Sequence, residues 1–208
     1  GFKLNICHQK RGIRRQYISY GKFCNHHICN GRISQCIDFR RINLVTKFDT
    51  EQIGNAEDIL SKLKHDQYFT NIDLSKGYWQ IPVEDKSKHV TAFSTPDGTY
   101  QFKKMPFGMV NSGSTFNRMM RKLLHGCENA DNYVDDILGH TIKWDHHLVT
   151  LRDIFTRVRD AGLTLKPSKC LIGFGNIAFT GHVVGNGLMQ MELVFLSIMV
   201  NLNVGVLG

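Results

Sequence analysis

The stretch Asn-Tyr-Val-Asp-Asp-Ile-Leu-Gly-His at residues 132–140 is the most informative segment of the chain. It is an apolar run with two adjacent acids, Asp135 and Asp136, at its centre. Strand interiors disfavour aspartate, and neighbouring residues of a regular strand point to opposite faces. Both carboxylates could point the same way at the tight turn of a hairpin, or one could act directly while the other supports it. An Asp-Asp pair taken alone is more often just the mark of a turn.

A third acid ends another apolar run. Residues 69–74, Phe-Thr-Asn-Ile-Asp-Leu, alternate strictly, which predicts a strand with Phe69, Asn71 and Asp73 on one side. Burying an unpaired carboxylate is costly, and a hard divalent cation offsets that cost because carboxylate oxygens are its preferred ligands. Three acids brought together from two strands, with basic residues such as Arg40 nearby, would form a plausible two-metal site for phosphoryl transfer.

Three helices are predicted from caps and periodicity. Asn55 can cap a helix over residues 56–66, and an amphipathic pattern predicts a second over residues 112–125, closed by Gly126. A third helix, ended by Gly162, is marked by apolar residues at helical spacing, namely Leu148, Leu151, Phe155 and Val158.

Further short apolar runs predict strands at residues 79–83, 89–94 and 100–105, with a turn at residues 95–98. Residues 170–174 and 177–184 are predicted as two strands joined by a tight turn at Gly175-Asn176. Because helices and hairpins interleave, the predicted fold class is α+β with a largely antiparallel sheet packed on helices.

Composition and charge narrow the class of protein. The chain has 208 residues, of which 42% are hydrophobic and 21% charged, a balance that excludes a fibre or a disordered tail. A net charge of +8, with nine basic residues against one acid in residues 1–41, favours a polyanionic partner such as nucleic acid or an anionic membrane.

The N-terminal segment and the cysteines do not indicate a secreted protein. The N-terminal segment has no apolar core of a secretory signal peptide, so we expect an intracellular protein with free thiols. The cluster Cys24, His26, His27 and Cys29 does not have the spacing of a zinc site. Residues 191–208 are apolar, but Glu192 and two asparagines argue against a membrane span.

Several motifs in the same order resemble one family. Residues 36–184 resemble the fingers and palm of a reverse transcriptase, most closely that of gypsy-type LTR retrotransposons. The matching motifs are Cys36-Ile37-Asp38-Phe39-Arg40-Arg41-Ile42-Asn43, Asp73-Leu74-Ser75-Lys76-Gly77-Tyr78-Trp79-Gln80-Ile81, Thr91-Ala92-Phe93, Met105-Pro106-Phe107-Gly108-Met109, Thr115-Phe116, Tyr133-Val134-Asp135-Asp136-Ile137, Lys169-Cys170 and Phe179-Thr180-Gly181-His182. Any one of them is weak evidence, whereas the ordered series is specific.

The resemblance implies a fold with a reverse-transcriptase-like palm and partial fingers, and a catalytic centre. Asp73 and Asp135 would ligate two Mg²⁺ (or Mn²⁺) ions directly, with Asp136 as the weaker third ligand. The activity implied is RNA-directed DNA polymerisation, in which dNMP passes from dNTP to a primer 3′-hydroxyl on an RNA or DNA template.

The resemblance also implies binding residues. Tyr78 would exclude a 2′-hydroxyl, and the remaining nucleotide-binding residues would be Leu74, Ser75, Lys76, Gly77, Phe107 and Gly108. Contacts to template and primer would involve Arg40, Tyr133, Val134, Phe179, Thr180, Gly181 and His182.

The predicted organisation is a basic segment at residues 1–33, a reverse transcriptase domain at residues 34–184 and an apolar segment at residues 185–208, without the thumb, RNase H and integrase segments of the family. Ser34 stands where the family usually has a basic residue. Two alternatives stay open: an inactive retroelement remnant that at most binds nucleic acid, and a metal-dependent nuclease. No membrane partner is expected.

Overall fold

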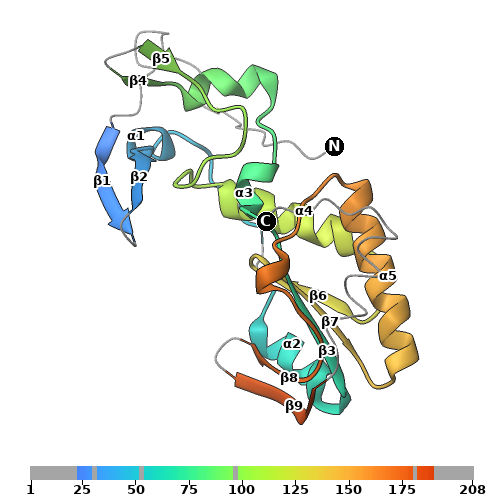
Figure 1. The fold of residues 1–208 in the computed structure, drawn as a ribbon. Helices are drawn as coiled ribbons and strands as arrows, with labels where there is room; N and C mark the ends of the chain where they lie inside the picture. Colours follow the sequence, from blue (N-terminus) through green and yellow to red (C-terminus); the bar gives the residue numbers. More distant parts are fainter. Residues whose placement is uncertain (1–22, 30–31, 52–53, 96–97, 180–181, 190–208) are drawn as a thin grey trace. The chain divides into compact units, whose positions relative to one another are not determined.

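The computed structural model describes residues 23–189 except 30–31, 52–53, 96–97 and 180–181 (Figure 1). The chain divides into two compact units, which are described separately. The first comprises Gly1–Glu51 with Tyr78–Phe116, and the second comprises Gln52–Gly77 with Asn117–Gly208.

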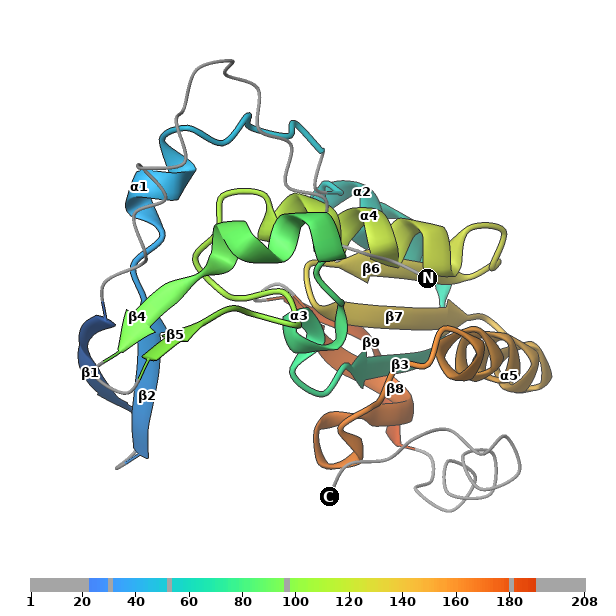
Figure 2. The same cartoon turned by 90° about the horizontal axis from the view of Figure 1, so that it is seen from above.

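The second unit is built on a five-stranded antiparallel sheet with the strand order β6-β7-β3-β8-β9. Figure 2 shows β6, β7, β3 and β8 following one another across it. The strands are β3 (Tyr68–Asp73), β6 (Ala130–Tyr133), β7 (Asp136–Thr141), β8 (Leu171–Phe179) and β9 (His182–Met189). The predicted α+β class with an antiparallel sheet is therefore confirmed.

Two helices of this unit begin or end where the sequence indicates. Helix α2 (Ala56–Lys62) starts after Asn55, whose side-chain oxygen accepts a hydrogen bond from the Glu57 N–H at 3.1 Å. Beyond Lys62 the chain tightens into a 3₁₀ turn, η2 (Leu63–His65), so the α-helix is shorter than the predicted 56–66. Helix α5 (Trp144–Asp160) is closed by Gly162, whose φ of +68° suits glycine.

The two faces of the sheet have different coverings. Strands β3 and β7 pair so that Phe69, Asn71 and Asp73 of β3 lie opposite His140, Leu138 and Asp136 of β7. Because partners in register share a face, these six residues lie on one side of the sheet. A core on that side combines residues of α2, η2 and the sheet, namely Ile59, Leu63, Phe69, Leu138, Ile177 and Phe179.

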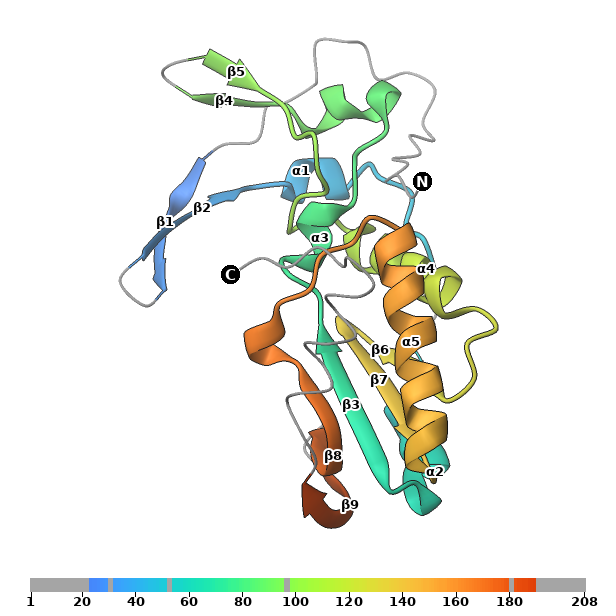
Figure 3. The ribbon, with the colours of Figure 1, turned by 45° about the vertical axis from the view of Figure 1, so that its right-hand side comes forward.

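Helix α5 covers the opposite face, as Figure 3 shows. Gly139 lies on this face, and a Cβ placed there would come within 3.4 Å of the Ile154 side chain of α5. Leu151, Ile154, Phe155 and Val158 of this helix are all fully buried. Each such side chain contributes roughly 1.5–3 kcal/mol through burial, so the helix is firmly held against the sheet.

The prediction of two strands at 170–174 and 177–184 is wrong. Strand β8 runs unbroken from Leu171 to Phe179, and the chain reverses only between Phe179 and His182, which are paired. The pairing of β8 with β9 is irregular between Phe174 and Asn176, so Gly175 marks a bulge and not a turn. A Cβ on Gly185 would lie 2.0 Å from the Gly175 carbonyl oxygen, so the strands approach closely here.

The first unit contains two hairpins and short helices. Its elements are β1 (Phe23–Cys29), β2 (Arg32–Ile37), α1 (Arg40–Asn43), the 3₁₀ segment η3 (Asp85–Thr91), β4 (Phe93–Thr95) and β5 (Gly98–Tyr100). Two helices cross the boundary between the units along the chain, namely α3 (Gly77–Gln80) and α4 (Ser112–Leu124). Helix α4 confirms the predicted amphipathic helix, and Gly126 has φ of +73° just beyond it.

Three predictions in this unit are wrong. The strand predicted at 79–83 begins as helix α3, the first half of 89–94 belongs to η3 with only residues 93–94 in β4, and the strand predicted at 100–105 ends at Tyr100. Short apolar runs do not distinguish a strand from a tight helical turn, since either conformation buries Ile81, Val83 and Val90. The predicted turn is supported by the pairing of Thr95 with Gly98, although Pro96 and Asp97 lie outside the described residues.

Within the described part of the chain, no helix is long and apolar enough to cross a membrane. Residues 191–208 lie outside the described residues.

Candidate active site

The ends of two paired strands bring the predicted acids together. Asp73 is the last residue of β3 and Asp136 the first of β7, and they are register partners on one sheet face. Asp135 precedes Asp136 in the turn between β6 and β7. A hairpin turn was one of the two arrangements that the adjacent aspartates left open, and the structure has it.

The turn of this hairpin is strained. Tyr133 pairs with Asp136, which leaves Val134 and Asp135 as a two-residue loop. Val134 has φ of +53°, a left-handed conformation that a β-branched residue rarely adopts and that costs on the order of 1–3 kcal/mol. A positive φ at the first loop position alone corresponds to a type II′ turn, which matches the twist of a hairpin. Such strain is typical of sites where position matters more than stability.

The three carboxylates repel one another electrostatically. Burial and the charge of Asp73 raise the pKa of Asp135 above its usual range, and Lys169 offsets this in part. The pKa of Asp136 is also raised, by burial, then by Asp73, with a further contribution from Asp135. A hydrogen bond from Asn71 acts in the opposite direction on Asp136. A cation at this edge of the sheet would relieve the repulsion.

Lys169 provides part of that compensation. It ends the 3₁₀ turn η4 (Pro167–Lys169), and its Nζ lies 3.2 Å from Oδ2 of Asp73. The lysine side chain remains more than half exposed, so the pair lies at the solvent boundary. An exposed ion pair of this kind contributes at most about 1 kcal/mol, which a stronger ligand can displace.

Asn71 is a site residue that the motif comparison missed. Its Oδ1 is buried and has no hydrogen-bond partner, although its side chain bonds to Asp136. Leaving a buried polar oxygen without a partner costs roughly 1–3 kcal/mol of folding free energy. A water or an ion that bonds to this oxygen would remove that cost. The period-two alternation of β3 was the signal for it, since Asn71 and Asp73 share a face.

The donor chemistry of this edge suits a hard divalent cation. Carboxylate and amide oxygens are the ligands that Mg²⁺ and Mn²⁺ prefer, and their charge is only partly balanced by Lys169. The side chains do not yet have the arrangement of metal ligands. In the described ranges, no group of three or more His, Cys, Asp and Glu side chains could hold a metal ion as it stands.

The backbone after Asp73 is only partly available to a phosphate. The N–H of Ser75 donates to the Thr164 carbonyl at 3.0 Å, and Leu74 is buried and bridged to Leu165. Ser75 therefore does not offer a free N–H as expected for a phosphate cradle. Lys76 has φ of +50°, an uncommon conformation for a lysine.

The first unit holds the other predicted nucleotide-binding residues. The Tyr78 ring stacks on Phe116, with ring centres 4.9 Å apart, and is tilted against Phe107 at 5.0 Å. Phe107 is 55% exposed, so much of its ring lies at the surface. The structure therefore brings Tyr78 and Phe107 together and leaves one ring open to solvent.

The loop that carries Phe107 and Gly108 is braced by side chains. Asn43 donates from Nδ2 to the Gly108 carbonyl at 2.8 Å and accepts at Oδ1 from the Val110 N–H at 2.9 Å. The Ser112 hydroxyl donates to the Pro106 carbonyl at 3.0 Å. Gly108 has φ of +85°, which favours glycine, so the loop conformation is set by both sequence and hydrogen bonding.

The predicted nucleic-acid contacts differ in exposure. Arg40 is highly exposed and forms a forked ion pair with Asp38, with NH2 to Oδ2 at 2.7 Å. Tyr133 packs edge-on against Phe179 at 5.7 Å, and Phe179 is only 3% exposed. The Phe179 side chain is therefore buried away from any surface contact, whereas Val134 and His182 are exposed. Thr180 and Gly181 lie outside the described residues.

Comparison with known proteins agrees with this geometry. Residues 26–184 match the family Reverse transcriptase (RNA-dependent DNA polymerase), and the chain belongs to it. Its curated relatives include polyproteins of retrotransposons and viruses. The Drosophila melanogaster Pol polyprotein from transposon 297 is 40% identical over 150 residues, and that from transposon 412 is 34% identical over 148. The matched segment is thus the reverse transcriptase domain found in Pol polyproteins.

Solved structures show the same fold. The foamy viral protease–reverse transcriptase in complex with an RNA/DNA hybrid is 27% identical, with a TM-score of 0.68 over 76% of this chain and 22% of that chain. A foamy viral form in complex with double-stranded DNA is 26% identical, with a TM-score of 0.70 over 83% of this chain and 30% of that chain. The match to the transposon 297 polyprotein covers 71% of this chain but only 14% of that polyprotein.

Proposed function

We propose that this chain is an RNA-directed DNA polymerase domain of a gypsy-type LTR retrotransposon, and that residues 34–184 carry the activity. The observation that carries the proposal is the pairing of Asp73 with Asp136 beside Asp135, where strands β3 and β7 meet at their ends. In a nucleotidyl transfer, two divalent ions lower the pKa of the attacking hydroxyl and stabilise the departing pyrophosphate. Asp73 and Asp135 would hold these ions, with Asp136 as the third ligand.

Lys169 and Asn71 would support ion binding by the three acids. When no cation is bound, Lys169 balances Asp73 at 3.2 Å. Ion binding would release this lysine to a phosphate group, since a flexible ammonium readily exchanges one oxyanion partner for another. Asn71 orients the Asp136 carboxylate through its hydrogen bond, and its unpartnered oxygen would accept from a water of the ion.

The aromatic pair of the first unit would receive the incoming nucleotide. Tyr78 is fixed by Phe116 and Phe107, so its ring presents a rigid wall. Such a wall would leave no room for a 2′-hydroxyl and would favour dNTP over NTP. The exposed Phe107 and the braced Gly108 would complete the nucleotide pocket.

The partners of this domain would be a primed RNA or DNA template and dNTPs, with an intracellular site of action because dNTPs are found inside cells. The complexes of the foamy viral enzymes with RNA/DNA hybrid and double-stranded DNA support this, as does the net charge of +8. Arg40, Tyr133, Val134 and His182 are the exposed or half-buried candidates for these contacts.

Primer extension tests the proposal. A labelled oligo(dT) primer on poly(rA) is incubated with dTTP and either Mg²⁺ or Mn²⁺, using the full chain and the double variant Asp135→Asn/Asp136→Asn. The control is Asp160→Asn, which removes an exposed acid of α5. Extension by the wild type and the control but not by the double variant is expected. Primer shortening would indicate a nuclease, and folded wild type without extension would indicate an inactive remnant.

A further inference from the structure

We propose that His140 is a positioning residue of the polymerase site, a buried cation that holds the β6–β7 hairpin on which Asp135 and Asp136 are carried. The role rests on the proposed function, because it concerns the same hairpin. Neither the motif comparison nor the family match assigns His140 any part.

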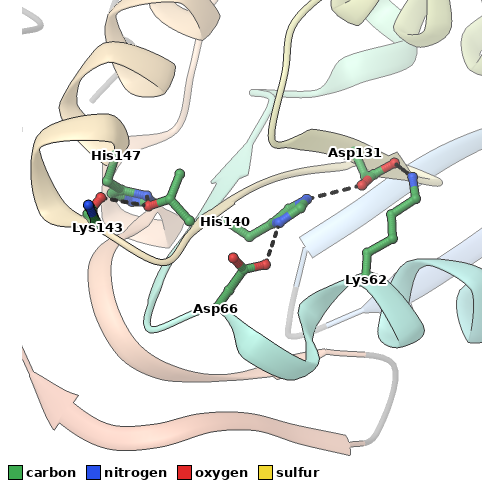
Figure 4. A network of polar contacts seen from close by, with 7 residues as sticks. Lys62, Asp66, Asp131, His140, Lys143 and His147 are labelled. Carbon is green, nitrogen blue, oxygen red and sulfur yellow. Dashed lines mark hydrogen bonds and ion pairs between the residues drawn. The ribbon is translucent and has the colours of Figure 1, made fainter.

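The observation behind it is a chain of four side chains (Figure 4). His140 is 6% exposed, and its Nδ1 lies 2.7 Å from Oδ2 of Asp66, just after η2. Its Nε2 lies 3.1 Å from Oδ2 of Asp131 on β6. The other oxygen of Asp131 accepts a hydrogen bond from Lys62 of α2 at 2.7 Å. One histidine of β7 thus joins β6 to the segments that precede β3.

This geometry requires a protonated ring. A neutral imidazole has one N–H and one lone pair, so it can donate to only one of two ionised carboxylates. Both bonds are satisfied together only by the imidazolium, and the charges of His140 and Lys62 then balance those of Asp66 and Asp131. Burial alone would lower the pKa of His140, but the hydrogen bonds to Asp131 and Asp66 outweigh it and raise the pKa. The remaining titratable neighbour is His147 of α5.

The hairpin needs such a connection because β6 is an edge strand. It forms four residue pairs with β7 and has no strand on its other side among the described residues. Asp131 belongs to the second pair from the open end, and the turn bearing Asp135 is at the other end. The bonds of His140 and Lys62 to Asp131 tie the open end to β7 and α2. Without them, fraying would reach the strained turn at Val134.

Direct observation of the ring is the first test. In the full chain, ¹⁵N NMR of histidine is expected to show both His140 nitrogens protonated at pH 7, and the ring is expected to keep its proton to a pH above the ordinary histidine pKa. Asp66→Asn, which removes the negative charge and keeps one side-chain oxygen as an acceptor, is expected to lower that pH. A neutral His140 with a single tautomer at pH 7 would overturn the proposal.

Hydrogen exchange then tests positioning without using activity. His140→Gln, which supplies no cation, is expected to accelerate exchange of the β6–β7 ladder amides at least tenfold relative to those of β8. The matched control His146→Gln changes an exposed histidine of α5 and is expected to leave the exchange of both the β6–β7 amides and the β8 amides unchanged. If His140→Gln proves unstable, Asp66→Asn is measured in its place, with a smaller acceleration expected. Equal exchange in variant and wild type would contradict a positioning role.

Activity supplies the second readout. In primer extension, His140→Gln is expected to lower kcat about tenfold, as is typical when a residue supporting metal ligands is lost, with a smaller effect on the KM for dTTP. Unchanged kcat would count against the proposal. If the wild type itself does not extend a primer, the proposed function fails, while the ring protonation and exchange measurements still decide the role of His140 in the hairpin.

Discussion

Asp73 and Asp136 lie directly opposite each other as antiparallel partners at the ends of β3 and β7. Two ionised carboxylates on the same face of a sheet repel each other, and like charges directly opposite destabilise a strand pair. The fold keeps them despite this cost, beside a valine in a left-handed conformation. Retention of both features at one edge of the sheet is the pattern expected when stability is exchanged for function.

Asp136→Asn is expected to stabilise the chain when no metal ion is present. The pKa of Asp136 is raised in the folded state, so its ionised form disfavours folding at neutral pH. The amide removes that charge and should increase the free energy of unfolding by on the order of 1 kcal/mol. The gain should fade as pH falls through the raised folded pKa toward the ordinary carboxyl value, because the wild type then becomes protonated. Urea denaturation at pH 7 and pH 4 measures it, and a loss of stability at pH 7 would contradict the account.

Tyr78→Val is expected to weaken the choice of dNTP over NTP. The substitution removes the ring that stacks on Phe116 and leaves an apolar side chain too small to exclude a hydroxyl. Steric selection of this size corresponds to a loss of about 10- to 100-fold in the ratio of kcat/KM values for dTTP and UTP. Tyr100→Val, at a half-exposed tyrosine of β5, is the control. An unchanged ratio would show that Tyr78 only packs.

Gly185→Ala is expected to disrupt the β8–β9 hairpin. The new Cβ would lie 2.0 Å from the Gly175 oxygen and 2.8 Å from the Phe69 ring, and φ at this position is +106°. We expect a loss of more than about 3 kcal/mol in the free energy of unfolding. Gly126→Ala, with φ of +73° and nothing within 4 Å of its Cβ, should lose only about 1–2 kcal/mol through backbone strain. Equal losses measured by denaturation would rule out the close approach.

The two buried histidines are expected to give opposite pH dependences. Burial, and to a smaller extent His140, lower the pKa of His147 from 6.5 to about 4, so folding loses stability as pH falls through this window, by roughly 3 kcal/mol in total. The pKa of His140 is raised, so its contribution is complete below the unfolded value and disappears as pH rises through the folded one.

The hydrogen bonds of His147 fit its neutral form. The Thr141 hydroxyl donates to the Lys143 carbonyl, so it accepts from Nδ1 of His147, while Nε2 accepts from Thr70. Denaturation between pH 4 and pH 8 should show a smaller acid loss in His147→Gln than in the wild type. His146→Gln should follow the wild type, and identical acid slopes in all three proteins would contradict the assignment.

The sequence predicted those element boundaries that one or two local residues determine. Asn55 predicted the start of α2, and the glycines at 126 and 162 predicted helix ends. Each depends on a local conformational or capping preference that tertiary contacts do not override.

Elements that depend on distant contacts were not predictable in this way. Gly175 carries the same local signal in a bulge as in a turn, and only the approach of Gly185 from β9 distinguishes the two. The pairing of Lys169 with Asp73 joins residues 96 positions apart, and that of His140 with Asp66 joins residues 74 apart. No spacing rule finds such partners, because they follow from how distant segments of the chain pack together.

Mn²⁺ binding is the most direct test of whether the edge formed by Asp73, Asp135 and Asp136 is a divalent-metal centre. Free Mn²⁺ is measured by electron paramagnetic resonance during titration of the wild type, Asp135→Asn/Asp136→Asn and the surface control Asp160→Asn. We predict that the wild type and the control remove Mn²⁺ from solution equally, that Mg²⁺ competes, and that the double variant loses this binding while remaining folded. Equal Mn²⁺ binding by the double variant and the wild type, or none by either, would contradict the account.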